Sequence, residues 1–160
     1  MLKHFHFINI SELILIFTLT MKNWIIYSFI SMFFAGITSV IAKFGMKDIS
    51  SDLGLAVRTS VVFIFVLLNF LTFQNIQEVN NLTTRAVLFL MISGLTTTLS
   101  WVFYYKAIKI GEVSYVASID KGSIIITLLL SFIILGEPVT PKILIGGALI
   151  VAGMLVLTIK

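Results

Sequence analysis

Residues 114–135 read SYVASIDKGSIIITLLLSFIIL, an apolar run interrupted near its start by two adjacent charges, Asp120 and Lys121. With its flanks the run is long enough to cross a bilayer, which takes about 20 residues of helix. An ionisable side chain inside a membrane costs roughly 3 kcal/mol at mid-bilayer and less toward the interface. The cost of burying these two charges must therefore be offset. They either form a structural ion pair near a helix end or lie beside a polar cavity through which a solute passes.

The composition of the 160-residue chain is typical of an integral membrane protein. Hydrophobic residues make up 59% of it and charged residues only 11%, and the mean hydropathy is +1.12. A soluble domain of this length needs far more polar surface. The runs at 61–71 and 124–135 are almost continuously apolar, whereas the strands of a membrane barrel would alternate apolar and polar residues. The sequence therefore predicts an all-α membrane protein.

Five apolar stretches are long enough to span the bilayer, so the predicted fold is a bundle of five transmembrane helices. Their predicted bounds are 24–44, 53–73, 85–105, 114–135 and 142–159. Capping residues at 50–52 and at Thr83 or Thr84 favour helix starts there. Thr140 and Pro141 open the last helix, because proline suits the first helical turn.

The first twenty residues are set apart from these helices. Residues 7–20 are apolar but too short to span a membrane. Met21 begins a short polar stretch that leads to Trp24 at the expected membrane interface. We therefore treat 1–20 as a segment that either precedes a true start at Met21 or lies loosely on the surface. Residues 21–160 form a single transmembrane domain.

Several kinds of chemistry are not expected. The chain has no cysteine, which excludes disulfides and thiolate metal sites. His4 and His6 lack the further ligands that a metal site requires. No clustered nucleophile and base and no phosphate-binding loop can be found, so neither an enzyme nor a cofactor is expected. We assign the net charge of +4 to loops at the membrane surface rather than to a nucleic-acid site.

The charges within the spans are the first candidate site residues. Arg58 lies about a turn and a half inside the second span. It either extends to the interface or lines a cavity, as a cation for an anionic group or as a partner for Asp120. On a continuous helix Asp120 and Lys121 point about 100° apart, so they are not expected to pair with each other. We predict Asp120 as a coupling or ion-pair residue, with Arg58, Lys43 and Lys121 as candidate counter-ions.

Aromatic and small residues supply the other candidates. At the end of the third span stand Trp101, Tyr104 and Tyr105, which either mark the membrane interface or form the wall of a binding cavity. In the fifth span small residues form stripes suited to close helix packing, with Gly146, Gly147 and Gly153 among them.

The positive residues predict the orientation. Five spans place the termini on opposite sides of the membrane. The N-terminal side carries Lys3, Lys22, Arg85 and Lys142, and the other side carries Lys43, Lys47, Arg58, Lys106, Lys109 and Lys160. Because positive residues prefer the cytoplasm, we expect a cell-membrane protein with its C-terminus inside.

Several motifs resemble those of the drug/metabolite transporter superfamily. They are Ala56-Val57-Arg58 in the second span and residues 101–107 leading into KIGEVS at 109–114. More specific are LGEP at 135–138 and IGGALIVAG at 145–153, which are similar to the end of the EamA-type domain. The resemblance covers about residues 24–159. Usual members have ten spans made of two such domains, so this chain resembles the smaller five-span members.

The resemblance implies an alternating-access carrier of small metabolites or drugs. A five-span chain would then work as a homodimer or as a paired half-transporter, and the stripe at Gly146 and Gly153 resembles the helix-pairing stripe of small multidrug transporters. The chain departs from its relatives at Asp120-Lys121, where apolar residues or proline are common. Two alternatives stay open: a non-transporting membrane subunit of a larger complex, and a flippase for lipids or lipid-linked substrates.

Overall fold

The computed structural model describes residues 23–73 and 76–159 of the chain. The predicted N-terminal segment 1–20, with its two histidines, and the proposed start at Met21 lie outside the described residues. Residues 39–159 contain the contacts between helices that are discussed below, and residues 23–38 belong to a separate unit.

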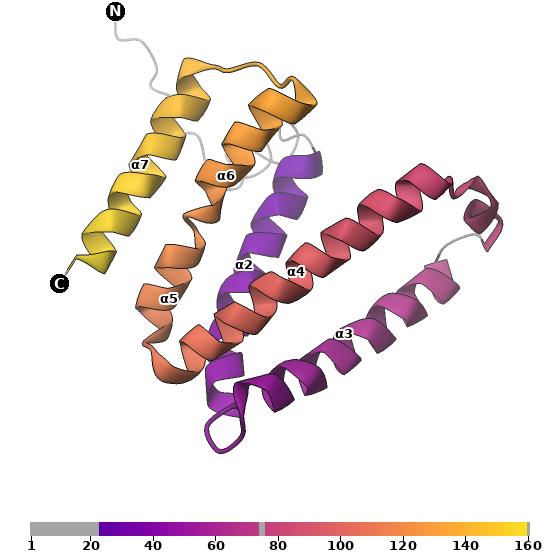
Figure 1. The fold of residues 1–160 in the computed structure, drawn as a ribbon, viewed down its shortest axis with the longest axis horizontal. Coiled ribbons are helices and arrows are strands. Elements are labelled where there is room, and N and C mark those ends of the chain that lie inside the picture. The colour runs from indigo at the N-terminus through magenta and orange to yellow at the C-terminus, as the bar shows by residue number, and fades with distance from the viewer. Residues whose placement is uncertain (1–22, 74–75, 160) are drawn as a thin grey trace, which may run out of the picture. The chain divides into compact units, whose positions relative to one another are not determined.

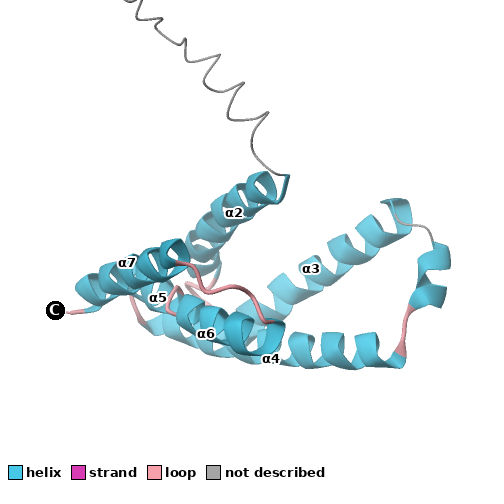
Figure 2. Cartoon of the chain, turned by 90° about the horizontal axis from the view of Figure 1, so that it is seen from above, coloured by secondary structure: helices cyan, strands magenta, loops and turns pink. Residues whose placement is uncertain are grey.

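Every described residue lies in a helix or a loop (Figure 2). The elements in chain order are α2 (Asn23–Gly45), α3 (Ser51–Phe73), η1 (Ile76–Asn81), α4 (Thr84–Ile110), α5 (Val113–Asp120), α6 (Ser123–Leu130), η2 (Ser131–Leu135) and α7 (Pro141–Thr158). By length and composition five stretches are suited to cross a membrane: α2, α3, α4, the combined Val113–Leu135 and α7. The predicted all-α fold with five spans is confirmed.

The helices begin where local chemistry predicts. The Thr83 hydroxyl accepts a hydrogen bond from the Ala86 amide at 3.2 Å, and the Thr140 hydroxyl accepts one from the Ile143 amide at 3.3 Å. The Ser50 hydroxyl accepts from the Leu53 amide at 3.2 Å and so caps α3. Each of these bonds satisfies an amide that has no partner within its own helix.

Helix α4 is longer than predicted. It ends at Ile110 rather than at residue 105. The predicted bound was set by the thickness of a bilayer, but nothing in residues 106–110 breaks a helix. The helix stops at Gly111, whose amide donates to the Ala107 carbonyl at 2.8 Å. The last turn of α4 therefore extends the helix past the predicted membrane limit.

The fourth span is interrupted, whereas the sequence predicted one continuous helix over 114–135. Figure 1 shows α5 and α6 as separate helices with a break between them. At the break the Gly122 amide donates to Ile119 at 2.9 Å, and the Ile124 amide donates to Lys121 at 3.1 Å. These are three-residue steps in place of the four-residue steps of an α-helix. The span then ends in the wider turn η2, which Gly136 closes with φ at 66°.

The small buried core lies where the end of α2, the start of α3 and the end of α4 meet. Its members are Met46, Leu55, Tyr105 and Ile108. The start of α3 lies beside the end of α4 (Figure 1). Gly54 lets Met46, just beyond the end of α2, pack against the start of α3, because a Cβ atom there would lie only 2.5 Å from Cγ of Met46.

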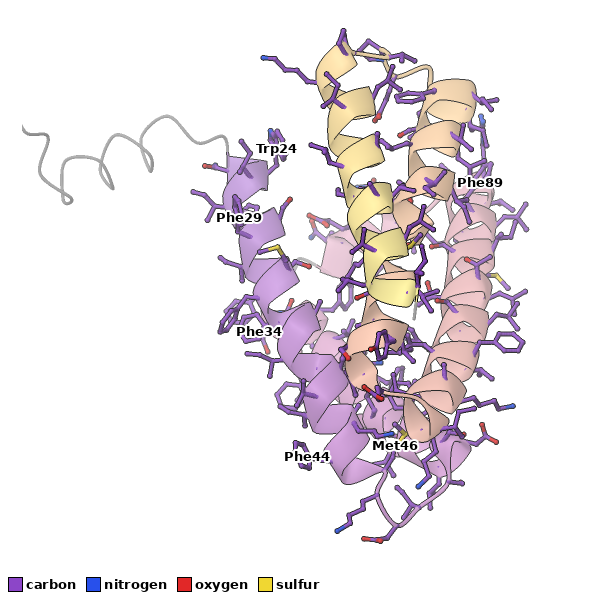
Figure 3. The ribbon with its side chains drawn as sticks, turned by 90° about the vertical axis from the view of Figure 1, so that its left-hand side faces the viewer. Trp24, Phe29, Phe34, Phe44, Met46 and Phe89 are labelled. Atoms are coloured by element: carbon purple, nitrogen blue, oxygen red, sulfur yellow. The ribbon has the colours of Figure 1, made fainter. Side chains whose placement is uncertain are left out.

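Most large apolar side chains are exposed rather than buried. Phe29, Phe34 and Phe44 stand out from the axis of α2 (Figure 3), with exposed fractions of 53%, 62% and 76%. Phe89 on α4 is 59% exposed. In water such a surface would be strongly unfavourable, so it is suited to lipid or to other membrane helices.

The glycines of α7 differ in what they face. A Cβ atom on Gly147 would lie 2.9 Å from Cδ1 of Leu128 on α6, so Gly147 allows close packing inside the chain. At Gly146 and Gly153 a Cβ atom would meet nothing within 4 Å in the described structure. The predicted pairing face of Gly146 and Gly153 is therefore open among the described residues.

Candidate functional site

Arg58 of α3 stacks on an aromatic face of α4. Its guanidinium carbon lies 4.2 Å from the centre of the Trp101 ring and 5.8 Å from that of Tyr105. Trp101 and Tyr105 are four residues apart, so they share one face of the helix. Because the electron-rich faces of aromatic rings attract cations, this contact holds the arginine charge against α4.

Two polar atoms beside this stack have no hydrogen-bond partner among the described residues. They are Nη1 of Arg58 and the hydroxyl oxygen of Tyr105, and both are buried. The neighbouring Tyr104 differs, since its hydroxyl donates to Oγ of Ser39 at 2.7 Å. The predicted aromatic group thus divides into Tyr104, which bonds to the end of α2, and the pair Trp101 and Tyr105, which contact Arg58.

Lys43, a candidate counter-ion of Asp120, bonds to backbone carbonyls in the structure. Its ammonium donates to the carbonyls of Ile108 at 2.6 Å and of Lys109 and Gly111 at 3.0 Å each. The last carbonyls of a helix lack intrahelical donors and carry partial negative charge, which explains why they attract a lysine. Lys43 therefore caps α4. Among the described residues it forms no ion pair with Asp120.

Lys109 makes the converse contact and was missed in the sequence. Its ammonium donates to the carbonyls of Met46 and Lys47, just beyond the end of α2. A lysine in the last turn of a helix is the available signal, but its partner is more than sixty residues away in the chain. A pocket of about 310 Å³ lies between the two lysines and is also lined by Phe44, Met46 and Lys47.

Asp120 and Lys121 pair with each other, which corrects the prediction that they would not. Nζ of Lys121 lies 3.7 Å from Oδ2 of Asp120. The prediction assumed a continuous helix, but α5 ends at Asp120 and Lys121 lies in the break. The two side chains are 41% and 66% exposed, respectively, so neither is enclosed by the chain. Within the described residues Arg58 forms no ion pair with Asp120 and stacks on Trp101 instead.

The hydroxyl groups in the middle of α4 bond to their own helix. The side chains of Thr96 and Thr97 donate to the Ser93 carbonyl at 2.9 and 2.8 Å, and Thr98 donates to Gly94 at 2.9 Å. This is the ordinary behaviour of a threonine within a helix. In the described part of the chain no group of three or more metal-ligating side chains occurs.

An apolar groove of about 460 Å³ lies between α6 and α7. Apolar side chains of both helices line it, among them Ile125, Leu128, Val151 and Leu155. Almost no polar group faces this groove, in contrast to the charged groups at Arg58 and at Asp120.

Five membrane-length helices with an exposed apolar surface define a multi-pass membrane protein. Residues 22–159 match the EamA-like transporter family, and the chain belongs to that family. This confirms the resemblance to the drug/metabolite transporter superfamily.

A relative from Sinorhizobium sp. is described as "Uncharacterized transporter in cobO 3'region". The two sequences are 33% identical over 138 residues, which cover 86% of this chain and 98% of the relative. No solved structure matches the chain significantly.

Proposed function

We propose that the chain is one half of a membrane transporter that moves small metabolites or drugs across the cell membrane by alternating access, with two copies forming the working unit. Membership of the EamA-like transporter family supports transport as the activity. The observation that carries the mechanism is the break in the fourth span at Asp120 and Lys121.

A break in a membrane helix costs free energy when it leaves backbone groups without hydrogen bonds. Backbone groups that leave the helical pattern must find other partners, because lipid offers none. Many transporters place their substrate and coupling-ion sites at discontinuous helices, beside charged side chains. The interruption in this chain is a tightened turn, in which Lys121 and Gly122 keep right-handed helical angles. The Gly122 amide here bonds to Ile119 in place of Ser118, the acceptor in a continuous helix. The Asp120 carboxylate stands next to this altered backbone.

Asp120 is suited to act as the coupling residue. Its separation of 3.7 Å from Lys121 makes a weak, partly exposed pair rather than a locked one. A proton or a cationic group that binds the carboxylate competes with the lysine and changes the charge at the break. Such a change biases a helix that is already divided into two short segments.

A second copy would complete the unit. Five helices are few for enclosing a solute pathway. At Gly146 and Gly153 on α7, a Cβ atom would meet no atom of the described residues within 4 Å. Small residues of this kind let the backbones of membrane helices approach closely. We assign this face of α7 to the contact between copies.

Transport by the purified chain in proteoliposomes tests the proposal. A panel of labelled metabolites and cationic drugs is offered, and uptake is followed at several pH values. We expect uptake by the wild type that Asp120→Asn reduces and makes insensitive to pH. Asp48→Asn is the matched control, because Asp48 lies on an exposed turn. If Asp120→Asn leaves both the turnover and its pH dependence unchanged, Asp120 is structural.

Two alternatives give different results in the same preparation. A non-transporting subunit of a larger complex would neither self-associate nor carry any solute. A lipid flippase is favoured by the groove between α6 and α7, whose apolar lining and volume of about 460 Å³ suit an acyl chain. In that case fluorescent lipid analogues would be moved between leaflets, and they would compete with any soluble substrate.

A further inference from the structure

We infer that Arg58, together with Tyr105 and Trp101, forms a binding site for an oxyanion, either a carboxylate or a phosphate, carried by the transported solute. This inference rests on the proposed function, since it names the chemical class of the substrate. It uses a part of the chain that is separate from the break at Asp120.

The two unpartnered donors are the starting point. Buried polar groups in proteins are nearly always hydrogen-bonded, so each exception requires an explanation. Here two exceptions occur beside each other, Nη1 of Arg58 and the hydroxyl of Tyr105. The Tyr105 side chain is only 3% exposed. Nη1 of Arg58 can only donate, and the Tyr105 hydroxyl can donate as well as accept. An acceptor placed beside them would therefore satisfy both groups.

The charge of Arg58 identifies the kind of acceptor. A guanidinium stays protonated and presents its donors as a planar fork, which matches the two oxygens of a carboxylate or phosphate. Within the described residues no carboxylate forms an ion pair with Arg58. The contact with Trp101 at 4.2 Å attracts the cation but accepts none of its in-plane hydrogen bonds. An oxyanion supplies both the negative charge and the missing acceptors.

The surroundings of Arg58 differ from those of an ordinary surface arginine. The Arg58 guanidinium lies over the Trp101 ring, and Tyr105 adds a neutral donor one turn further along α4. Arg58 itself is half-buried, so part of its side chain is accessible from outside while Nη1 is enclosed. By contrast, Arg85 at the start of α4 is exposed and lies 5.7 Å from the Phe89 ring, with no buried donor.

Trp101 provides a direct readout of binding. The chain has two tryptophans, so Trp24→Phe leaves Trp101 as the only one. An anion that binds Arg58 changes the charge next to the indole and hence its emission. The full-length protein is purified in a maltoside detergent, which contains neither phosphate nor carboxylate. It is titrated with inorganic phosphate, acetate and succinate at constant ionic strength, with chloride as the neutral salt. Phosphatidylglycerol in the same micelles serves as a separate lipid anion.

We expect saturable changes in Trp101 emission with phosphate or a carboxylate. Arg58→Gln should weaken the binding by about tenfold to a hundredfold, the usual effect of losing hydrogen bonds to a charged group. Tyr105→Phe should weaken it about twofold to tenfold, since its donor is neutral. Arg85→Gln removes the same charge, and Tyr104→Phe removes a hydroxyl that is already bonded. Both should leave the binding unchanged.

Several outcomes would overturn the inference. They are no saturable response to any of the three soluble anions, an equal response in Arg58→Gln, or a response to phosphatidylglycerol alone. If Arg58→Gln fails to fold, Arg58→Lys and Tyr105→Phe decide, because the lysine retains the charge without the planar fork. Weakened binding in both supports the site, and unchanged binding in both overturns it.

The inference and the proposed function fail in different ways. Suppose that the chain transports neutral or cationic solutes, but that anions cause no Arg58-dependent change in Trp101 emission. The proposed function then stands, and the anion site is excluded. A chain that binds anions through Arg58 but carries no solute in proteoliposomes retains the site and loses the function.

Discussion

Lys43 and Lys109 each cap the helix that carries the other. Lys43 on α2 donates to three carbonyls at the end of α4, and Lys109 on α4 donates to two carbonyls beyond the end of α2. Each ammonium thus satisfies carbonyls at or just beyond a helix end, where intrahelical donors run out. These reciprocal hydrogen bonds hold together the ends of α2 and α4, which are far apart in the sequence. They lie directly beside the buried Met46 and Ile108.

Removing one of these caps should weaken the structure. Lys43→Met keeps an apolar stem but leaves three carbonyls without the ammonium, so we expect a loss of about 2 kcal/mol in unfolding free energy. Denaturation of the purified protein in mixed detergent micelles measures it. Lys106→Met is the control, because Lys106 is exposed and forms no hydrogen bond within the described residues. An equal loss for the two variants would contradict the capping role of Lys43.

The two caps should also be coupled. Lys43 and Lys109 hold the same pair of helix ends together. Once the first substitution has separated these ends, the second should therefore cost less unfolding free energy than it does alone. We expect the unfolding free energies of Lys43→Met, Lys109→Met and the double variant to depart from additivity by more than about 0.5 kcal/mol. Additive losses would show that the two ends are held independently.

Asp120 should matter far more for transport than for stability. Its contact with Lys121 is partly exposed, and such pairs contribute about 0–1 kcal/mol. Asp120→Asn should therefore shift the unfolding free energy by less than about 1 kcal/mol while it reduces flux. A loss of several kcal/mol would instead assign Asp120 to a structural role at the break.

Local chemistry explains which parts of the fold were predictable. The hydroxyls of Thr83 and Thr140 act on amides three residues away, so the sequence alone predicts these helix starts. The predicted spans agree with the observed helices for the same reason. A run of about twenty apolar residues indicates a membrane span whatever the rest of the chain contains. The bounds of α4 were less predictable, since a helix can continue beyond the bilayer until a residue such as Gly111 ends it.

The arrangement of the candidate site residues could not be predicted, because it depends on contacts between residues far apart in the sequence. The break after Asp120 lies where Gly122 meets α7, with a Cβ there only 2.8 Å from Sδ of Met154. The partner of Arg58 is an aromatic ring on the next helix, and the partners of Lys43 are carbonyls of α4 rather than a carboxylate. Carbonyls carry no sequence signal, because every residue has one. The charged residues were predicted, but their partners required the structure.

The predicted orientation can be tested with a pair of reporters. With its excess of positive residues, the side that holds Lys43 and Lys109 should be cytoplasmic, and the C-terminus with it. A fluorescent reporter that matures only in the cytoplasm should be active after Lys160. The same reporter inserted near η1 should be inactive. The opposite pattern would reverse the orientation, and activity at both positions would indicate dual insertion.

The glycines of α7 should separate packing within one chain from association between chains. Gly147→Leu places a side chain against Leu128, so it should destabilise the folded chain by about 1–3 kcal/mol. Gly146→Leu and Gly153→Leu meet no atoms of the described chain within 4 Å of the new Cβ. They should not lower the unfolding free energy, because leucine is favoured over glycine inside a helix by about 0.5–1 kcal/mol. If the copies meet on this face, the same two variants should lower the dimer fraction, measured by energy transfer between labelled chains in liposomes. Unchanged association would place the dimer contact on another helix, because a leucine side chain at either position would hold two backbones apart.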